Sequence, residues 1–407
     1  MDRKSHIRQE ILEELCHKGK LTRVEFSRRT GLRAATVFEV IDKLKAEGVI
    51  SELERKGKRT GRVSPVISLN ADHIWLAGID FQFNKTIGVI SKLNGETIVT
   101  AEVPGLSRNG IDACCGEIRT LIRMLKKKAG ANWSKVKGVG FADPGMVDIG
   151  RGVSLKAVNI SGWENFNTAD WLLRETGIAT RLIMPETLAG TFMEYHSRFP
   201  NPPPSIFRLN TGTGIGGGFI KDGNLFVGDS CRGMEIGHLL IQPDGPLCQC
   251  GNRGCLEAIA GESGIRQRVE ELIAKGVSTK LGIDKFSISA FCEAARHDKN
   301  ARMLAYDISG KVSSALCTVV TMLNPSLIVI GGELSKLGDI LLQTINRDLS
   351  LYCLPGTADK LSVEISRLDE YAAAKGVALM LREKILGLDT LVRKSFRTRV
   401  SYKDGIS

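Results

Sequence analysis

The sequence predicts an α/β protein in two parts, a small winged-helix module followed by a larger body. Two observations predict the module, residues 1–70: three segments with helical spacing of apolar residues, and two short strands joined by a basic segment. One observation predicts the body, residues 71–386: strand-like runs alternate with longer amphipathic segments. Residues 387–407 follow as a basic tail. A chain of 407 residues suits two or three domains of roughly 150 residues each.

Composition indicates a folded, soluble protein. Hydrophobic residues make up 43% and charged residues 25%, which excludes disordered, collagen-like and low-complexity classes. Apolar stretches stay far below the roughly 18 residues that span a bilayer, and the first residues lead into no apolar signal core. We therefore expect a cytoplasmic protein with no membrane partner, in which the ten cysteines are reduced thiols.

The excess positive charge lies at the two ends of the chain. The formal net charge is +11, and residues 1–70 hold 16 Lys and Arg against 10 Asp and Glu. Residues 381–407 hold 7 against 3. Phosphate contacts need Lys and Arg, so the basic module favours binding to a polyanion. A basic face that is simply solvated explains the charge on its own equally well, and the local pattern must decide.

The module has the pattern of a helix-turn-helix with a wing. Helices are predicted over 5–18, after the capping residue Thr22, and over 33–47, with Gly31 supplying the turn. Strands are predicted over 49–53 and 66–69, joined by the basic wing tip. The residues predicted to face inward are Ile7, Ile11, Leu12, Leu15, Val24, Phe26, Val37, Val40, Ile41 and Leu44.

In such a module the third helix lies in the major groove of DNA, with its first residues toward the base edges. Basic residues of the wing enter a minor groove or bind phosphate. The alternative is a helix-turn-helix that serves only dimerisation. The residues predicted to contact DNA are Thr22, Arg33, Ala34, Ala35, Thr36, Phe38, Glu39 and Lys43, with Arg59 and Arg62 on the wing.

The body begins with strands predicted over 74–80, 86–90 and 97–103, a helix over 111–128 and a strand over 136–141. From the module to about Leu386 the chain resembles the repressor branch of the ROK family, which comprises repressors, open reading frames and kinases. The resemblance implies an actin-like, two-lobed sugar-kinase fold of the ribonuclease H-like kind, with the ligand in the cleft. The matching segments are 143–148, 159–163, 211–218, 235–238, the cysteines of 248–255 and 329–332.

One imidazole and three thiols are closely spaced in the body. His238 precedes Cys248, Cys250 and Cys255, and this set fills a tetrahedral zinc shell with no position left for water. We therefore expect one structural zinc ion per chain, wrapped by a loop that contains Gly251 and Gly254. Three buried free cysteines are the alternative. The family resemblance also implies zinc at this cluster.

The resemblance further implies an effector site for a sugar or sugar derivative. Its carboxylates are Glu235 and Glu257, each able to accept hydrogen bonds from hydroxyl groups, and His238 is held at the cleft edge by the metal. Asn159 and Glu186 complete the expected effector set. The alternative is that Glu235 and Glu257 only brace the metal loop.

The residues of kinase chemistry are altered. The Asn-Asp pair of family kinases, whose Asp is the general base, falls on Pro185 and Glu186. The glycines of their first phosphate turn are replaced by Gln82 and Phe83. The glycine run 212–218 remains, but a hairpin also needs one. We therefore expect no enzymatic activity and no catalytic residue.

Together these patterns predict a sequence-specific regulator that binds double-stranded DNA as a homodimer or higher homo-oligomer. It is expected to repress carbohydrate-related genes, and a small-molecule effector is expected to control it. Two alternatives stay open. One is a bifunctional ATP-dependent sugar kinase that also binds DNA, and the other is a regulator controlled by a protein partner.

Overall fold

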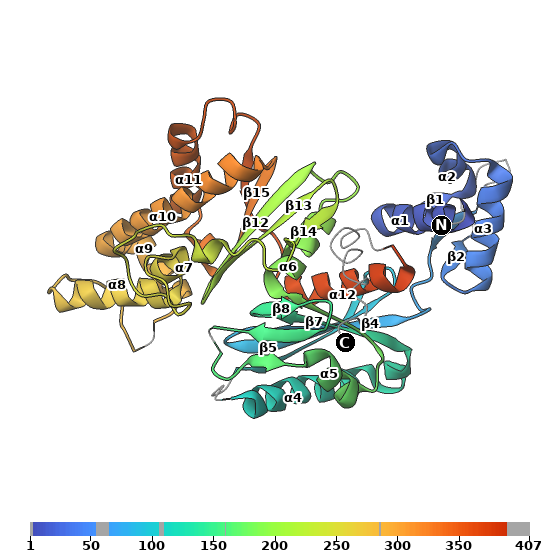
Figure 1. Cartoon of the computed structure of the whole chain (residues 1–407), viewed down its shortest axis with the longest axis horizontal. Helices are drawn as coiled ribbons and strands as arrows, with labels where there is room; N and C mark the ends of the chain where they lie inside the picture. Colours follow the sequence, from blue (N-terminus) through green and yellow to red (C-terminus); the bar gives the residue numbers. More distant parts are fainter. Residues whose placement is uncertain (1–2, 54–64, 106–109, 159, 285, 389–407) are drawn as a thin grey trace, which may run out of the picture. The chain divides into compact units, whose positions relative to one another are not determined.

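The computed structural model of the chain describes residues 3–53, 65–105, 110–158, 160–284 and 286–388. The chain divides into two compact units (Figure 1). The first comprises Met1–Leu155, Asn165–Pro202 and Tyr371–Ser407, and it contains the winged helix together with one α/β lobe. The second comprises Lys156–Glu164 and Pro203–Glu370. The body expected over 71–386 is thus divided between the two units, and nearly all of the basic tail lies outside the described residues.

The winged-helix module has the three predicted helices. They are α1 (Arg3–Lys18), α2 (Arg23–Thr30) and α3 (Ala34–Ala46). The short strands β1 (Lys20–Thr22), β2 (Ile50–Leu53) and β3 (Val66–Leu69) form an antiparallel sheet in the order β1-β3-β2. The sequence did not predict β1. The apolar stripes of α1 and α3 meet in one buried core, which also includes Leu93, Leu386 and Leu388 of the lobe.

One inward-facing residue was predicted wrongly. Phe26 of α2 is fully buried, whereas the side chain of Val24 is 47% exposed. Two positions along a helix correspond to a rotation of about 200°, so Val24 and Phe26 point in nearly opposite directions and only one of them can face the core. The prediction placed two residues that are two positions apart on one face, which is correct for a strand but wrong for a helix.

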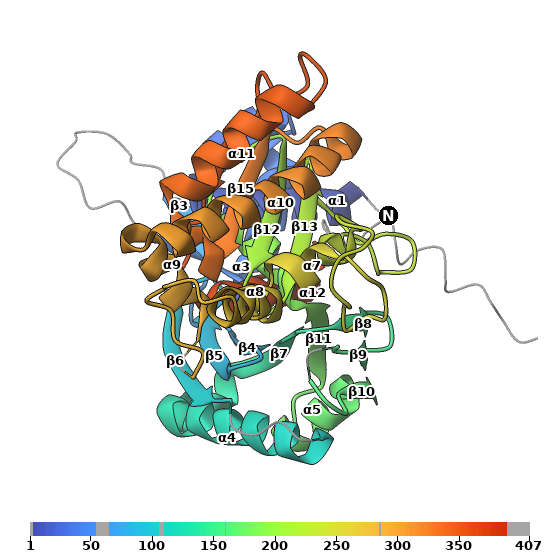
Figure 2. The ribbon, with the colours of Figure 1, turned by 90° about the vertical axis from the view of Figure 1, so that its left-hand side faces the viewer.

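The lobe of the first unit is built on a five-stranded sheet. Its strands are β4 (Trp75–Phe81), β5 (Lys85–Lys92), β6 (Thr97–Pro104), β7 (Val136–Asp143) and β11 (Thr180–Pro185), in the order β11-β7-β4-β5-β6. Strands β4, β5 and β6 are antiparallel, while β7 and β11 continue the sheet in parallel with β4. Figure 2 shows this order across the sheet. A small separate sheet contains β8 (Met146–Asp148), β9 (Val153–Lys156) and β10 (Glu164–Phe166).

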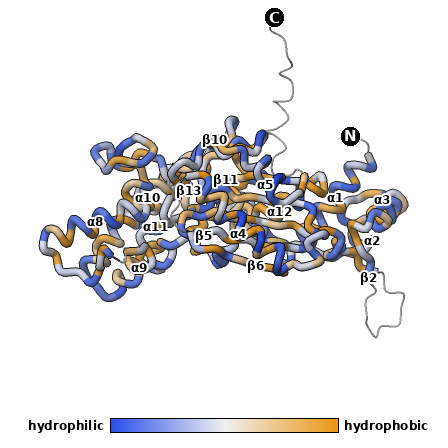
Figure 3. Tube along the Cα trace, turned by 90° about the horizontal axis from the view of Figure 1, so that it is seen from below, coloured by the Kyte–Doolittle hydropathy of each residue, from blue (hydrophilic) through white to orange (hydrophobic). Residues whose placement is uncertain are grey.

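Helices cover both faces of this sheet. Figures 1 and 2 show α4 (Ile111–Ala129) and α5 (Thr168–Thr176) on one face and α12 (Ala372–Leu386) on the other, where α6 (Glu186–His196) packs beside it. A short 3-10 helix, η1 (Gly130–Lys135), leads from α4 into β7. Helix α12 lies very close to β4, because a Cβ atom at Gly78 would be 2.0 Å from the carbonyl oxygen of Ala374. Apolar residues of α4 face the core and its lysines face solvent, which gives the mixed colours along this helix in Figure 3.

The second unit repeats the strand order of the first lobe. Its sheet has the order β14-β13-β12-β15-β16, in which β12, β13 and β14 are antiparallel and β15 and β16 are parallel to β12. If the five strands of each sheet are numbered along the chain, both sheets have the spatial order 3-2-1-4-5. The strands are β12 (Ser205–Thr211), β13 (Ile215–Lys221), β14 (Asn224–Phe226), β15 (Leu327–Gly332) and β16 (Ser362–Ile365).

The helices of the second unit pack into one large apolar core with this sheet. They are η2 (Ile236–His238), α7 (Leu256–Ala260), α8 (Glu262–Ala274), α9 (Ile288–His297), α10 (Lys299–Leu323), η3 (Glu333–Leu337) and α11 (Asp339–Tyr352). Two lobes with one strand order, preceded by a winged helix, confirm the predicted fold class. Within the described residues, every helix is too short or too polar to cross a membrane.

Candidate functional site

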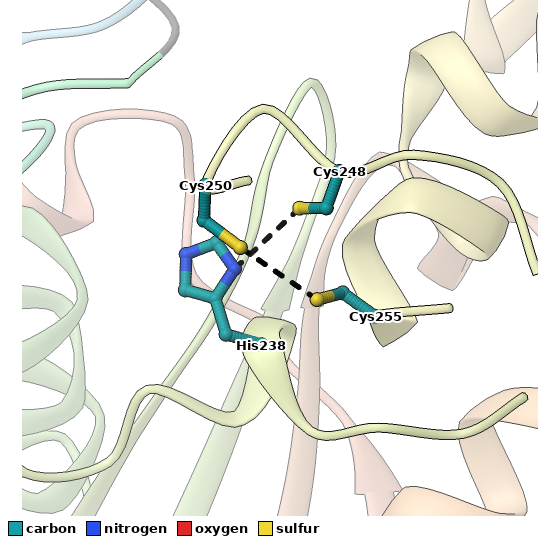
Figure 4. Close-up of side chains that lie close together, drawn as sticks. All are labelled: His238, Cys248, Cys250 and Cys255. Carbon is teal, nitrogen blue, oxygen red and sulfur yellow. Dashed lines mark hydrogen bonds between the residues drawn. The ribbon is translucent and has the colours of Figure 1, made fainter. Parts of the chain in front are cut away.

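The four predicted metal ligands lie together in the second unit (Figure 4). His238 is the last residue of η2, Cys248 and Cys250 lie in the following loop, and Cys255 immediately precedes α7. Nδ1 of His238 is 3.7 Å from Sγ of Cys248, and Sγ of Cys250 is 3.7 Å from Sγ of Cys255. All four ligand atoms lie within 4.8 Å of one another. The structure thus brings together residues that are up to 17 positions apart in the sequence.

The spacing of these atoms suits a tetrahedral ion. Zinc–sulfur bonds of about 2.3 Å place two tetrahedral thiolates about 3.8 Å apart, close to the observed sulfur–sulfur distance. Cys248 and Cys255 are buried, whereas Cys250 is exposed. Burial raises the pKa of the Cys255 thiol to about 12. A metal ion that binds here must therefore displace protons from the cluster.

Glycine shapes the loop that carries the cysteines. Gly251 and Gly254 adopt φ angles of +96° and +69°, which favour glycine. At Gly254 a Cβ atom would also lie only 1.5 Å from the carbonyl oxygen of Gln242. The amide of Cys248 donates a 2.7 Å hydrogen bond to the carbonyl of Asn252, which closes the turn. The backbone therefore holds the thiols close together through its own hydrogen bonds and close contacts.

Two of the predicted effector carboxylates lie beside this cluster. Glu257 is the second residue of α7, and its buried carboxylate accepts a 2.8 Å hydrogen bond from the amide of Ile215. Glu235 precedes η2 and is exposed. Although part of its surface is open to solvent, the surrounding protein removes some of its hydration, which is the main cause that raises the pKa of Glu235. His238 lowers this pKa and Glu257 raises it, and the net shift is upward. Glu235, His238 and Glu257 thus form one polar group at the start of β13.

Of the other two predicted effector residues, one belongs to the first unit and one lies outside the described residues. Glu186 belongs to the first unit, where it is the first residue of α6. Pro185, just before it, ends β11 and is paired with Asp143 at the end of β7. Asn159 lies outside the described residues.

The segment that the family resemblance identifies as the first phosphate turn joins β4 to β5. The side-chain amide of Gln82 donates a 2.7 Å hydrogen bond to Oδ2 of Asp80, and the backbone amide of Gln82 donates to the carbonyl of Lys85. The side chain of Phe83 is 46% exposed. Gln82 and Phe83 thus both place side chains in the turn between β4 and β5.

The retained glycine run forms a hairpin. Residues 212–214 join the antiparallel strands β12 and β13, and the amide of Gly212 donates to the carbonyl of Gly214 at 2.9 Å. The hydroxyl of Thr213 donates a 3.1 Å hydrogen bond to Glu262 at the start of α8. A Cβ atom at Gly217 would also lie 2.8 Å from the ring of Phe207, so packing within the second unit requires a glycine at that position.

Most of the predicted DNA-contacting residues form one surface on α3. Arg33, directly before α3, is exposed, as are Ala34, Ala35, Glu39 and Lys43 on the helix. Thr36 and Phe38 are half-buried. Phe38 packs under the guanidinium of Arg23, at 5.5 Å from the ring centre. Glu39 forms an ion pair with Lys4 of α1.

Thr22 is the N-terminal cap of α2. Its side chain is 7% exposed, and its hydroxyl accepts a 3.1 Å hydrogen bond from the amide of Glu25. The Glu25 carboxylate in turn accepts from the amide of Thr22 at 2.7 Å, which completes a capping box on α2. The predicted helix cap is confirmed, and the hydroxyl of Thr22 is used in it. Contact of Thr22 with DNA stays a prediction. Arg59 and Arg62 lie outside the described residues.

The structure also brings together a group of ligating side chains that the sequence did not predict. His17 of α1, His196 of α6 and Glu383 of α12 place one possible ligand atom each within 4.8 Å of one another. Burial is the main cause that lowers the pKa of His17, to about 4, and it also lowers the pKa of His196. Both imidazoles are therefore neutral near pH 7. No spacing rule connects three residues so distant in sequence.

Two family models match the chain. The model described as ROK family matches residues 76–384, and the model described as winged helix-turn-helix DNA-binding matches residues 4–51. Together they cover both the module and the body.

The similar proteins include repressors and kinases. The chain is 24% identical to the xylose repressor of Caldicellulosiruptor bescii over 92% of this chain and 95% of that protein. It is 31% identical to the glucokinase of Thermotoga maritima over 61% of this chain and 80% of that protein. Among solved structures, a ROK family transcriptional regulator, a homologue of the Escherichia coli MLC protein, superposes with a TM-score of 0.78 at 21% identity. That match covers 94% of this chain and 99% of that one.

Proposed function

The chain belongs to the ROK family, and on this premise we propose that it is a sequence-specific, DNA-binding transcriptional regulator that represses carbohydrate-related genes. The observation that carries the proposal is the presence of a winged helix and a ROK body in one chain. The similarity to the xylose repressor extends over 92% of the chain, whereas the similarity to glucokinase extends over 61%. A protein named as a repressor therefore matches 92% of this chain.

The proposed DNA-binding surface is the exposed start of α3. Arg33 offers bidentate hydrogen bonding, the small Ala34 and Ala35 allow a close approach to base edges, and Lys43 supplies charge further along the helix. Arg59 and Arg62 of the wing are proposed to add minor-groove or phosphate contacts. A homodimer would present two such helices to half-sites about one or more helical turns apart, near 10 base pairs each.

The proposed effector is a sugar or sugar derivative that binds at Glu235 and Glu257. The free carboxylate oxygens of this pair can accept hydrogen bonds from hydroxyl groups, and the hydrogen bond from Ile215 fixes one side of Glu257. Asn159 and Glu186 remain in the proposed effector set. Zinc held by His238, Cys248, Cys250 and Cys255 would cross-link η2 to the start of α7, and thereby position the two carboxylates that flank it.

We further propose that the body does not transfer phosphate. Phosphoryl transfer depends on positioning the phosphate and stabilising its charge, and Gln82 and Phe83 place side chains in the turn that would have to approach it. A general base must lie within hydrogen-bond reach of the sugar hydroxyl. Glu186 is one methylene longer than the family's Asp, and Pro185 lacks the side-chain amide that precedes it in the kinases.

A bifunctional sugar kinase with DNA binding is the second candidate. The 31% identity to a glucokinase favours it, and a carboxylate at position 186 is retained. Control by a protein partner is a further alternative for the regulator. These candidates differ in whether they respond to a sugar, respond to a protein or consume ATP, so experiments on these three properties separate them.

The test starts with selection of DNA fragments from a genomic library by the full-length protein. Enrichment of palindromic sites near sugar-utilisation genes is the expected result. Release of the selected DNA is then measured with a panel of sugars, amino sugars and sugar phosphates, because an effector must bind free and DNA-bound protein with different affinities. Failure to enrich any site would overturn the proposed function, and release by none of the compounds would favour a protein partner.

A further inference from the structure

A compact group of metal-ligating side chains joins the winged helix to the lobe within the first unit. His17 lies one residue before the end of α1, His196 is the last residue of α6, and Glu383 lies in the last turn of α12. Three elements that are far apart in the sequence thus meet at one point. The group is separate from the cysteine cluster, which belongs to the second unit.

The packing of α6 against α12 sets two of these three residues side by side. A Cβ atom at Gly376 would lie 1.9 Å from the carbonyl oxygen of Ala189, so the two helices are in close contact there. His196 and Glu383 are each seven residues further along their helices, about two turns. There Nε2 of His196 is 3.1 Å from Oε1 of Glu383. The side chains of His196 and Glu383 are only 7% and 4% exposed.

Aromatic rings fix the orientation of both imidazoles. The ring of His17 stacks on Phe199, with 4.0 Å between centroids and 7° between planes. The ring of His196 meets the edge of Phe192 at 4.2 Å. The imidazole rings of His17 and His196 are 5.8 Å apart, centroid to centroid. Phe192 and Phe199 thus cover the two imidazoles with apolar surface, while the positive charge of Arg382 also acts on both rings.

We propose that His17, His196 and Glu383 bind a divalent transition-metal ion, with zinc as the best match, and that this ion fastens the winged helix to α6 and α12. Two imidazoles and one carboxylate are a known ligand set for zinc. Tetrahedral zinc with bonds of about 2.0 Å needs ligand atoms roughly 3.3 Å apart. The ligand atoms of His196 and Glu383 are 3.1 Å apart, and that of His17 lies within 4.8 Å of both. Magnesium and calcium prefer all-oxygen sites and fit poorly.

The winged helix already packs on the lobe at this junction. The side-chain amide of Gln9 donates a 2.7 Å hydrogen bond to the carbonyl of Gly387, and Leu386 and Leu388 belong to the core of the module. An ion at His17 would add a bond from the carboxyl end of α1 to the same region of α12. Metal binding would therefore restrain the module relative to the lobe.

The test is calorimetric titration of the full-length protein with zinc chloride, after its resident zinc has been measured. We expect one further equivalent, and we expect His17→Gln and Glu383→Gln each to weaken its binding at least tenfold. The matched control is His6→Gln, because His6 forms an exposed pair with Glu10 on the same helix, at 3.2 Å. This variant should bind zinc as the wild-type protein does, and magnesium should not compete.

Two further measurements keep the result interpretable. Melting temperatures without added metal show whether each variant is folded, and added zinc should raise the melting temperature of the wild-type protein but not that of His17→Gln. The same titration in a Cys250→Ser background should retain the extra equivalent, which assigns it outside the cysteine cluster. The proposal is overturned if the wild-type protein takes up no equivalent beyond that cluster, or if His17→Gln binds zinc as tightly.

Discussion

The guanidinium of Arg23 donates from Nε to the carboxylate of Glu52 at 2.6 Å, and so ties the start of α2 to β2 at the base of the wing. Nζ of Lys45 donates to the other oxygen of Glu52, also at 2.6 Å. The Glu52 side chain is only 14% exposed. One half-buried carboxylate therefore connects α2, α3 and β2.

The first prediction concerns this carboxylate. Hydrogen bonds from Lys45 and Arg23 lower the pKa of Glu52 below its ordinary value. Its contribution to stability is therefore fully present above the unfolded pKa of about 4.3 and is lost as the pH falls through the lower folded value. Glu52→Gln should cost about 1–2 kcal/mol at pH 7, because it weakens two charged hydrogen bonds.

The measurement is urea unfolding of both proteins at pH 7 and at decreasing pH. The difference between them should shrink below about pH 4. Glu96→Gln is the matched control, since Glu96 pairs with Lys92 at 3.3 Å but is 55% exposed. It should change stability by less than about 0.5 kcal/mol. An equal loss of unfolding free energy in both variants would show that the contacts of Glu52 contribute no more than an exposed ion pair.

The second prediction concerns the exposed face of α3. Arg33→Ala and Lys43→Ala should each weaken binding to the selected operator, because both residues are exposed and we propose that Arg33 contacts a base and Lys43 a phosphate. Loss of a bidentate base contact costs about 1–3 kcal/mol. Each lost phosphate contact should flatten the dependence of affinity on salt by up to about 0.9 in the log–log slope.

Fluorescence anisotropy with the operator at several salt concentrations measures both quantities. Lys127→Ala is the control, because it removes one exposed charge from α4 instead. Arg59 and Arg62 are changed together in a separate variant. This double substitution should flatten the dependence of affinity on salt further. Unchanged affinity in the Arg33 and Lys43 variants would exclude α3 as the recognition helix.

The third prediction concerns the cysteine cluster. The purified protein should contain zinc at His238, Cys248, Cys250 and Cys255, and Cys250→Ser should release it. Because metal binding is coupled to folding, the variant should also melt at a lower temperature. Cys353→Ser removes a thiol outside the cluster and should keep the metal. Elemental analysis of protein prepared without chelator decides the matter, and absence of zinc from the wild-type protein would refute it.

Local patterns predicted the winged helix and the cysteine cluster well. The helices of the module have apolar residues three and four positions apart, and this spacing places them on one face whatever the surroundings. The ligands at 248, 250 and 255 lie within one turn-rich loop, so short-range spacing was sufficient to group them. Only His238 had to be brought in from a distance, across 10 residues.

Other features depend on contacts that no local pattern records. Strand β1 has three residues and exists because it pairs with β3, more than 40 positions later. Val24 was misplaced because α2 is short and only Phe26 reaches the core. The group of His17, His196 and Glu383 arises from the packing of three helices. Its members carry no shared motif, and only the folded chain shows that they meet.

The fourth prediction is that the body binds a sugar-type effector without phosphorylating it. Glu235 is exposed and Glu257 is already hydrogen-bonded by Ile215, so Glu235→Ala should abolish the ligand-induced rise in melting temperature at little cost to the free protein. The phosphate turn holds Gln82 against Asp80. Incubation with ATP, magnesium and the sugar panel should therefore release ADP no faster than incubation without sugar. Glu186→Ala should leave this background rate unchanged. Sugar-dependent ADP release that Glu186→Ala abolishes would establish Glu186 as a working base despite its altered surroundings, and would make the chain a kinase that also binds DNA.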